Sequence, residues 1–534
     1  MPKRLLALFS ALLFALSGII ARLYTVMNGD YVDVAEQQSS LTITLATARG
    51  TLYDRRLERL TNRQSGYAAG VIGTPSALAA LSHRTEWESL SIRLSEGKPL
   101  VLTDTQPLPL VQGIRQFTVP VRYDDSAIAS HVIGTLGEDG HGVGGAERAL
   151  DDILSQNSGH LTVTYQTDGT GRVIENGEVT VENTLARSGG GAALTIDREL
   201  QQAVEILLGK QLSRGAAVVM DIQTGDILAL ASFPTYDASA VADYLSAEDQ
   251  PLFNRATAAY NCGSVFKTVT AMAALERGVP VTQSFDCVGY VQVGVNRIKC
   301  HHLLGHGSQT LFGGFAQSCN PYFIQLSALS GGNALHRYAS LLGFDSPIVL
   351  MERWQTDRAT LPNAEAFGSA ALRANLSIGQ GDLLATPVHI TAMTACVANG
   401  GAYHRPNLYL GTVDQLGVLR EAPRDAPSRI CSEQTAQTLR AMMCAVVADG
   451  TGTAAAPAVG TAGGKTGTAQ TGWTSDSGET MTHSWFTGFY PAEQPQYAVT
   501  VLAEDNGTTG ENAAPLFKIV CDKLYRMGYV KIPS

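Results

Sequence analysis

Apolar and polar residues alternate along the first third of the chain in the way that half-buried β-strands require. Residues 40–54, 114–123 and 159–183 show this alternation, and the last stretch contains Asp-Gly and Asn-Gly pairs. Such pairs favour the tight turns of β-hairpins. Residues 76–97 and 144–156 instead repeat apolar residues at helical spacing. The pattern predicts a strand-rich region that includes a few helices.

A glycine-rich stretch at residues 187–193 marks a change of pattern. Residues 195–212 place apolar side chains on one helical face, with Asp197 as the N-cap. Two apolar runs, 215–222 and 226–233, follow as a predicted hairpin. Three strand-like stretches and a last helix come near the C-terminus, at residues 463–470, 483–491, 496–505 and 514–529. This order, with a mostly helical middle, predicts an α+β domain with one antiparallel sheet flanked by helices.

The N-terminus carries an uncharged apolar run. Lys3 and Arg4 precede the 17 residues Leu5 to Ala21, a length near the lower limit for a membrane-spanning helix. Basic residues before the run favour a cytoplasmic N-terminus and place the rest of the chain outside. A cleavable signal peptide, ending near the small residues Ala15 and Ser17, is the alternative. Both interpretations predict an exported chain.

Composition excludes several classes of protein. The chain has 534 residues, of which 45% are hydrophobic and 16% are charged, so it is neither disordered nor a coiled coil. The net charge of −10 and the lack of a long basic block argue against nucleic-acid binding. We predict an anchor with a cytoplasmic tip over residues 1–27, a strand-rich domain over 28–189 and a larger domain over 190–534.

The eight cysteines are scattered and do not form the dense pattern of a disulfide-stapled module. Most are expected to be small buried side chains. Cys287 and Cys300 are close enough in sequence for a disulfide across a hairpin. A metal site completed by His301, His302 or His306 is a second interpretation, and free thiols are a third. Because the spacing matches no standard zinc pattern, no metal is expected.

Ser264 and Lys267 lie three residues apart in a predicted helix that begins near Ser264 and ends at Gly278. Positions i and i+3 share a helical face, so the hydroxyl and the amine can approach each other. A serine hydroxyl is a weak nucleophile until a base takes its proton. The pair alone is a weak signal, since Ser95 and Lys98 have the same spacing in a predicted turn.

Two further motifs follow in order. Ser318 and Asn320 stand in "SCN", and Lys465 begins "KTGT". The set Ser-x-x-Lys, Ser-x-Asn and Lys-Thr-Gly is found in penicillin-binding proteins and related β-lactamases. Four longer stretches are similar to the transpeptidase domain of class B penicillin-binding proteins, namely residues 217–237, 253–267, 376–401 and 483–491. The chain therefore resembles this family.

The resemblance extends to the N-terminal region. Residues 48–56 and 131–152 are similar to signatures of the family's pedestal domain, so the similarity covers nearly the whole chain. It implies that residues 28–189 form a pedestal, or dimerisation-like, domain and that residues 190–534 form the penicillin-binding transpeptidase domain.

The chain departs from the family pattern at two places. Arg56 and Leu57 replace an Asn-Gly pair, so this turn forms without the glycine of the family pattern. Cys262, two residues before the serine, stands where the family usually has proline. We interpret Gly379 to Gly381 as an architectural turn.

The resemblance implies a role for each motif residue. Ser264 would attack the carbonyl between two D-alanines of a peptidoglycan stem peptide, with Lys267 as general base. This base must be neutral, whereas a free lysine titrates near pH 10.4, so we expect burial and the charge of Lys465 to lower its pKa. Ser318 would pass a proton to the leaving amine, and Asn320 would bond Lys267 or the substrate amide.

The last motif would bind the other end of the substrate. Thr466 and Thr468, with Gly467 between them, would hold the terminal carboxylate near the charge of Lys465. The backbone N–H groups of Ser264 and Thr468 would form an oxyanion hole.

The implied activity is D,D-transpeptidation through a serine acyl-enzyme, without cofactor or metal. The implied partners are peptidoglycan stem peptides and their lipid-linked precursor, β-lactams, the membrane and a separate membrane glycosyltransferase. The implied location is the cell membrane, with the catalytic domain outside the cytoplasm. A carboxypeptidase or β-lactamase-type hydrolase with the same serine and a non-catalytic penicillin-binding scaffold or sensor are the alternatives; the anchor and the pedestal favour the transpeptidase.

Overall fold

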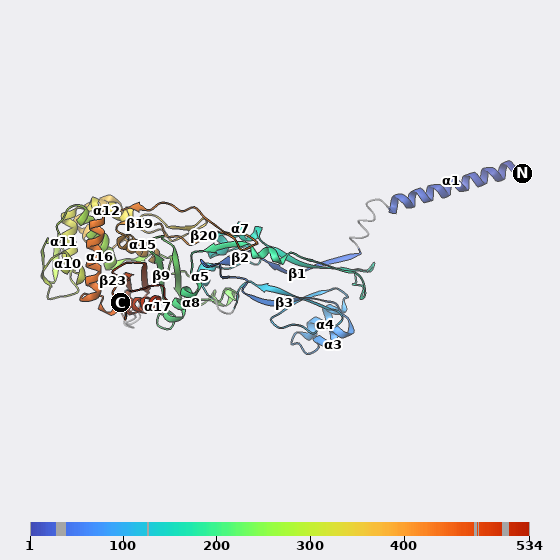
Figure 1. Ribbon diagram of the computed structural model, residues 1–534, viewed down its shortest axis with the longest axis horizontal. Coiled ribbons are helices and arrows are strands. Elements are labelled where there is room, and N and C mark those ends of the chain that lie inside the picture. The colour runs from blue at the N-terminus through green and yellow to red at the C-terminus, as the bar shows by residue number, and fades with distance from the viewer. Residues whose placement is uncertain are drawn as a thin grey trace. The chain divides into compact units, whose positions relative to one another are not determined.

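The computed structural model describes residues 2–27, 39–124, 128–474, 478, 480–504 and 512–532 (Figure 1). The chain folds into two units. The first consists of Met1–Gly50, Asn62–Arg122 and Gln156–Gly189. The second consists of Thr51–Thr61, Tyr123–Ser155 and Gly190–Ser534. Two segments that we included in the pedestal thus group with the second unit, while the domain bounds themselves stay a prediction.

The first unit begins with helix α1 (Pro2–Met27). Its most apolar window has a mean hydropathy of 2.1, and within the described ranges it is the one helix long and apolar enough to cross a membrane. This finding agrees with the predicted single-pass anchor. Whether the segment is cleaved stays a prediction.

Two antiparallel sheets of three strands make up most of the rest of this unit. One sheet has the order β1 (Ser40–Ala48), β6 (Gly159–Gln166), β7 (Val179–Asn183). The other has the order β4 (Leu100–Asp104), β3 (Gln64–Val71), β5 (Ile114–Val121), and helices α3 (Pro75–Leu81) and α4 (Trp87–Ser95) pack on it. Alternate residues of β6 are buried, as the sequence pattern predicted.

The second unit is built on a five-stranded antiparallel sheet with the order β10-β9-β25-β24-β23. The strands are β9 (Gly215–Asp221), β10 (Ile227–Phe233), β23 (Gly463–Thr474), β24 (Thr480–Tyr490) and β25 (Tyr497–Ala503). Ala216 and Val218 face one apolar core, while Ala217 and Val219 face another. Because both faces are covered, the strands read as apolar runs, and the predicted hairpin and C-terminal strands are confirmed.

Helices cover both faces of this sheet (Figure 1). On one face lie α8 (Arg198–Leu208) and α17 (Ala513–Arg526). On the other lie α9 (Lys267–Glu276), α11 (Asn320–Ser330), α15 (Pro387–Ala398) and α16 (Glu433–Ala448). The predicted α+β arrangement is confirmed.

Smaller elements lie between α9 and α10 (Leu311–Ala316). Strand β12 (Phe285–Cys287) pairs with β15 (Gly307–Gln309), and β13 (Tyr290–Val293) pairs with β14 (Asn296–Lys299). We call residues 285–309 the β12–β15 insertion.

A second sheet of this unit has the order β2-β8-β20-β21, with β2 (Thr51–Tyr53), β8 (Gly191–Leu194), β20 (Tyr409–Val413) and β21 (Leu419–Glu421). Directly after β2, the Asp54 carboxylate accepts hydrogen bonds from the backbone N–H groups of Arg56 and Glu58, both at 2.8 Å. Leu57 has a φ of 62°, where the family pattern has glycine. Leu57 therefore adopts the left-handed backbone conformation that glycine usually adopts in such a turn.

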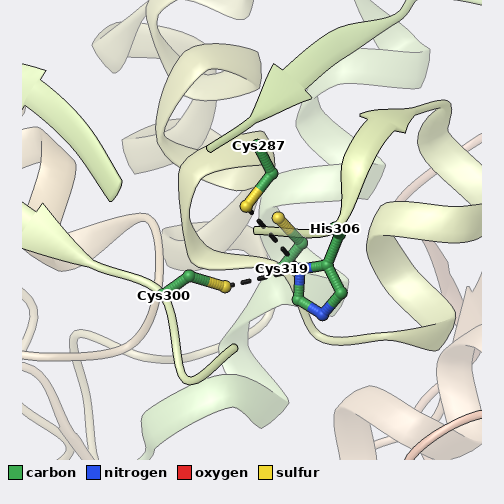
Figure 2. A group of neighbouring side chains, drawn as sticks. All are labelled: Cys287, Cys300, His306 and Cys319. Carbon is green, nitrogen blue, oxygen red and sulfur yellow. Dashed lines mark hydrogen bonds between the residues drawn. The ribbon is translucent and has the colours of Figure 1, made fainter. Parts of the chain in front are cut away.

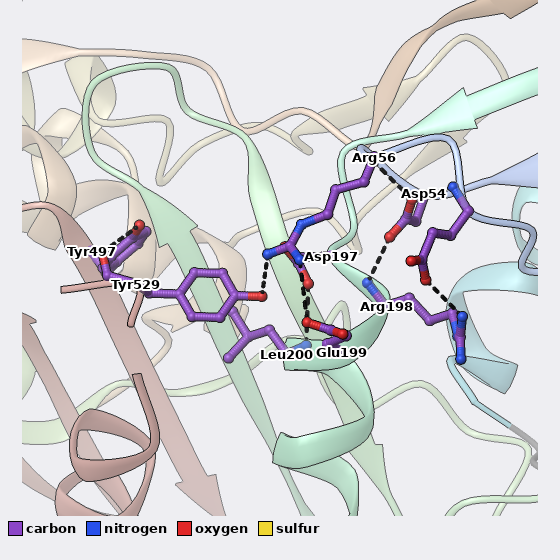
Figure 3. A network of polar contacts seen from close by, with 9 residues as sticks. Asp54, Arg56, Asp197, Arg198, Glu199, Leu200, Tyr497 and Tyr529 are labelled. Atoms are coloured by element: carbon purple, nitrogen blue, oxygen red, sulfur yellow. Dashed lines mark hydrogen bonds and ion pairs between the residues drawn. The ribbon is translucent and has the colours of Figure 1, made fainter. Parts of the chain in front are cut away.

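Arg56 links this turn to the start of α8 (Figure 3). Its guanidinium lies 3.0 Å from the carboxylate of Asp197 and donates to the hydroxyl of Tyr529 at 3.0 Å. The Asp197 side chain is only 2% exposed and accepts from the N–H of Leu200 as the predicted N-cap. Arg56 therefore supplies the counter-charge to a buried carboxylate.

We expect Arg56→Ala to lower the free energy of unfolding by about 1–2 kcal/mol, because Asp197 would keep a buried charge without this partner. The matched control is Arg198→Ala, which removes an ion pair with the 45%-exposed Glu58 and should cost less than about 1 kcal/mol. Thermal unfolding of the full chain measures the difference. Equal shifts for the two variants would contradict the role assigned to Arg56.

Candidate active site

Ser264 lies in a tight turn ahead of α9. Residues Gly263–Phe266 form a 3₁₀ turn, η3, so the α-helix predicted to begin near Ser264 begins at Lys267. Such turns are common at helix N-termini, and sequence spacing does not distinguish them from the helix. Cys262 has a φ of −77°, a value that proline also adopts, so this departure from the family pattern preserves the backbone.

Close approach of the turn to β23 requires a glycine before the serine. Gly263 has a φ of 58°, and a Cβ atom there would lie 2.5 Å from the carbonyl oxygen of Thr468. The turn is also tied to the predicted Gly379 turn, whose carbonyl accepts from the N–H of Gly263 at 2.8 Å. The two glycines therefore hold Ser264 against the third motif.

The second motif contains a residue, Ser318, with a strained backbone conformation. Ser318 lies between α10 and α11 with a φ of 52°, in the left-handed region that non-glycine residues rarely adopt. Its side chain is buried, and Asn320 is the first residue of α11. This turn directs both the carbonyl and the hydroxyl of Ser318 to Lys267.

The amine of Lys267 is the meeting point of the first two motifs. Its Nζ lies 3.0 Å from Ser264 Oγ and 2.7 Å from Asn320 Oδ1. It also lies 2.7 Å from the carbonyl oxygen and 3.1 Å from the Oγ of Ser318. The side chain is fully buried, and burial lowers the pKa of Lys267 to about 7.

A neutral amine suits this surrounding. It has two N–H groups, which can donate to the Ser318 carbonyl and to Asn320, and one lone pair, which can accept from the Ser264 hydroxyl. An ammonium has three donors and no lone pair, so it cannot take a proton from the serine. The arrangement can therefore activate Ser264 as a nucleophile.

A second buried lysine lies on β23. The Nζ of Lys465 donates to the carbonyl oxygen of Thr466 at 3.1 Å and lies 5.7 Å from the centre of the Phe315 ring. Burial, followed by repulsion from Lys267, lowers the pKa of Lys465 well below its ordinary value. The hydroxyls of Thr466 and Thr451 are 2.7 Å apart.

The three motifs open into one pocket of about 500 Å³. All motif residues except the two buried lysines line it: Ser264, Ser318, Asn320, Thr466, Gly467 and Thr468. The structure thus brings together every site residue that the sequence analysis named. A serine hydroxyl at the pocket wall, the Lys267 amine behind it and the hydroxyls of Thr466 and Thr468 nearby can support acyl transfer.

Five further residues line the pocket that sequence reasoning did not assign to it: His301, Thr451, Ser484, Trp485 and Asn512. Ser484 and Trp485 follow from their pairing in register with Thr468 and Gly467 across β23 and β24. His301 belongs to the β12–β15 insertion, and nothing in the local sequence indicates that this insertion reaches the pocket.

Comparisons with known proteins point to one family. A family model for the penicillin binding protein transpeptidase domain matches residues 215–522. Stage V sporulation protein D of Bacillus subtilis (strain 168) is 28% identical over 542 residues, which cover 94% of this chain and 82% of that protein. Peptidoglycan D,D-transpeptidase PbpA of Mycobacterium tuberculosis (strain CDC 1551 / Oshkosh) is 30% identical over 365 residues, which cover 62% of this chain and 72% of that protein.

A solved structure gives a third similarity. It is penicillin-binding protein A from M. tuberculosis as an imipenem acyl-enzyme complex. The TM-score is 0.63 at 25% identity, and the match covers 89% of this chain and 97% of that chain.

We expect Gly379→Ala to destabilise the turn under Ser264, because its Cβ would lie 1.9 Å from the carbonyl oxygen of Gly263. Gly381→Ala is the matched control, since Gly381 also has a positive φ but has only one atom, at 4.0 Å, near its Cβ position. The control should cost about 1 kcal/mol and Gly379→Ala about 3 kcal/mol or more, measured by thermal unfolding. A control that is as damaging as Gly379→Ala would show that steric overlap is not the cause.

Proposed function

Because the chain belongs to the penicillin-binding protein transpeptidase family, we propose that it cross-links peptidoglycan stem peptides as a D,D-transpeptidase. The observation that carries the proposal is the 3.0 Å contact between Lys267 Nζ and Ser264 Oγ in a pocket lined by all three motifs. β-Lactams would acylate the same serine, a proposal supported by the similarity to penicillin-binding protein A, whose structure is an imipenem acyl-enzyme complex.

Acylation begins with proton transfer from Ser264 Oγ to the neutral amine of Lys267. The oxygen then forms a bond to the carbonyl carbon between the two D-alanines, and the carbonyl oxygen takes the negative charge. The N–H groups of Ser264 and Thr468 bind this oxygen, and loss of one such donor typically costs about 100- to 1000-fold in rate. Collapse of the intermediate breaks the peptide bond and leaves a serine ester.

Ser318 then passes a proton to the departing nitrogen. Its Oγ lies 3.1 Å from Lys267 Nζ, so the proton taken from Ser264 can reach the amine of the terminal D-alanine through Ser318. In the second half-reaction an amine of a neighbouring strand attacks the ester. Its proton returns through Lys267 to Ser264, and the product is a new amide bond.

The carboxylate of the terminal D-alanine binds at the other end of the pocket, to the hydroxyls of Thr466 and Thr468. A carboxylate there favours the charged form of Lys465. A positive charge on Lys465 would in turn disfavour protonation of Lys267. In the free protein burial alone lowers the pKa of Lys267, so the contribution that we expected from Lys465 would arise only with a bound carboxylate. Substrate binding therefore reinforces the neutral state of the base.

Helix α1 anchors the enzyme in the membrane where lipid-linked precursors reside. Lys3 and Arg4 ahead of the apolar run support a cytoplasmic N-terminus and a catalytic unit outside the cytoplasm. The described part of the first unit consists of α1, two small sheets and short helices, so we propose that a separate membrane glycosyltransferase polymerises the glycan.

The product decides between transfer and hydrolysis. The purified full chain is incubated with lipid-linked substrate and a glycosyltransferase, and the muropeptides are analysed by mass spectrometry. We expect dimers linked through a new amide bond and release of free D-alanine. Trimmed monomers without dimers would instead favour a carboxypeptidase, in which water replaces the acceptor amine.

Substitution of the first motif tests the assigned roles. We expect Ser264→Ala to abolish covalent labelling by a fluorescent penicillin. Lys267→Arg keeps the positive charge but does not deprotonate, so labelling should slow by about 100-fold or more. Lys518→Arg, a partly exposed lysine on α17, is the matched control and should label normally. Normal labelling of Lys267→Arg would refute the assignment of the base.

The rate of acylation should depend on pH through Lys267. Burial lowers the pKa of this lysine to about 7, and only its neutral form accepts the proton. The rate should therefore rise with pH, from about one tenth of its maximum one unit below that pKa to a plateau above pH 8. Stopped-flow acylation measures the profile. A rate that keeps rising toward pH 10 would mean that the amine is charged at neutral pH.

A further inference from the structure

Four side chains of types that can bind a metal lie together (Figure 2), and one of them, Cys319, lies inside the second motif of the active site. Cys287 ends β12, Cys300 follows β14, His306 precedes β15, and Cys319 stands between Ser318 and Asn320. One ligand atom from each of the four lies within 4.8 Å of every other. The three cysteines are buried and His306 is half-buried. Each cysteine is a free thiol.

We propose that Cys287, Cys300, His306 and Cys319 bind one Zn²⁺ ion in a tetrahedral structural site. Zinc–sulfur bonds of about 2.3 Å and zinc–nitrogen bonds of about 2.0–2.1 Å place tetrahedral ligand atoms about 3.5–3.8 Å apart. The Sγ atoms of Cys287 and Cys300 already lie 3.6 and 3.5 Å from His306 Nδ1. Movements of about 1 Å or less would close the remaining spacing.

The donor set selects the metal. Three thiolates and one imidazole are soft to borderline ligands, which favour zinc over Mg²⁺ or Ca²⁺. Four protein ligands leave no open position, which is typical of a structural site rather than a catalytic one. From the sequence we expected no metal at Cys287 and Cys300, because their spacing with the neighbouring histidines matches no standard zinc pattern. Cys319 was not considered as a ligand there.

The backbone around the cluster is built to hold this geometry. Gly289 and Gly305 both have positive φ values, and a Cβ atom on either would lie 2.1 Å from a carbonyl oxygen, that of Leu303 or of Cys287 respectively. The β12–β15 insertion therefore folds backbone against backbone at the ligands. Such packing positions donor atoms before an ion arrives.

The ion would also fix the second catalytic motif, an effect that rests on the proposed function. Cys319 lies directly between Ser318, whose backbone is strained, and Asn320, and both of these residues contact Lys267. The Nδ2 of Asn320 donates to the carbonyl oxygen of Lys299 at 3.4 Å. Zinc would join the start of α11 to the β12–β15 insertion and so make Cys319 a positioning residue.

Metal content tests the site directly. The full chain is purified in detergent, incubated with one equivalent of Zn²⁺ and desalted, and its zinc is measured by elemental and native mass spectrometry. We expect one zinc per chain, and less than about one fifth of that for Cys287→Ala and His306→Ala. Cys444→Ala and His302→Ala, the matched controls for the two residue types, should retain the ion.

Three results would overturn the site: no bound zinc in the parent chain, equal loss from the control variants, or a disulfide between any two of the three cysteines in the native protein. Because Cys287→Ala could misfold, Co²⁺ bound to the unaltered chain provides a second measurement. Tetrahedral thiolate coordination gives intense visible absorption and sulfur-to-cobalt charge transfer. A weak octahedral spectrum would overturn the proposal.

Labelling by a fluorescent penicillin tests the link to the active site. Removal of zinc with a chelator should slow acylation by about 10- to 100-fold, and added Zn²⁺ should restore it. Unchanged acylation in the zinc-free protein would overturn the positioning role. Ser264→Ala should keep its full zinc content, so a failure of the proposed nucleophile and a failure of the metal site give different results.

Discussion

One amine, that of Lys267, lies in the interior of the second unit without a carboxylate partner among the contacts that the structure describes. A charged ammonium would be costly in this place, since apolar surroundings remove its hydration. The structure accommodates the amine in its neutral form, between a hydroxyl on one side and the oxygens of Ser318 and Asn320 on the other. Burial lowers the pKa of Lys267 to about 7, so at neutral pH about half of the amine is in the neutral form that can accept the serine proton.

The rest of the unit serves to bring distant segments to this amine. The five-stranded sheet places β23 at its edge, beside the turn that carries Ser264. Glycines make the approach possible, because a Cβ atom on Gly467 would lie 2.9 Å from Val265. From the other side, the turn before α11 supplies Ser318, and the first residue of α11 supplies Asn320. The zinc ion proposed at Cys319 would hold the Ser318–Asn320 segment in its position next to Lys267.

Much of the architecture could be predicted because it follows from local patterns. Hydrophobic periodicity and helix capping depend only on neighbouring residues in the sequence. They predict the strands β9 and β10, the Asp197 N-cap and the C-terminal strands. The three motifs could be named because their order is specific in combination. Chemistry that depends on residue type and order was therefore visible in the sequence.

Features set by long-range packing were not visible. Nothing local indicates that Ser318 adopts a positive φ or that His301 reaches the pocket. The grouping of residues 51–61 with the second unit depends on the parallel pairing of β2 with β8 and on Arg56 next to Asp197. Of the cysteine cluster, Cys287, Cys300 and His306 were considered as a metal site, but Cys319 was missed because it lies inside a motif that was interpreted only as catalytic.

The charge state of Lys267 is the most direct test of this account. Nuclear magnetic resonance of protein containing ¹³Cε-labelled lysine, with the Lys267 signal assigned from its absence in Lys267→Arg, reports the pKa of the free enzyme without any substrate. We predict titration near pH 7, as burial of the amine requires. Titration near 10.4, the value of a solvated lysine, would contradict a neutral base beside Ser264 and with it the mechanism proposed for this enzyme.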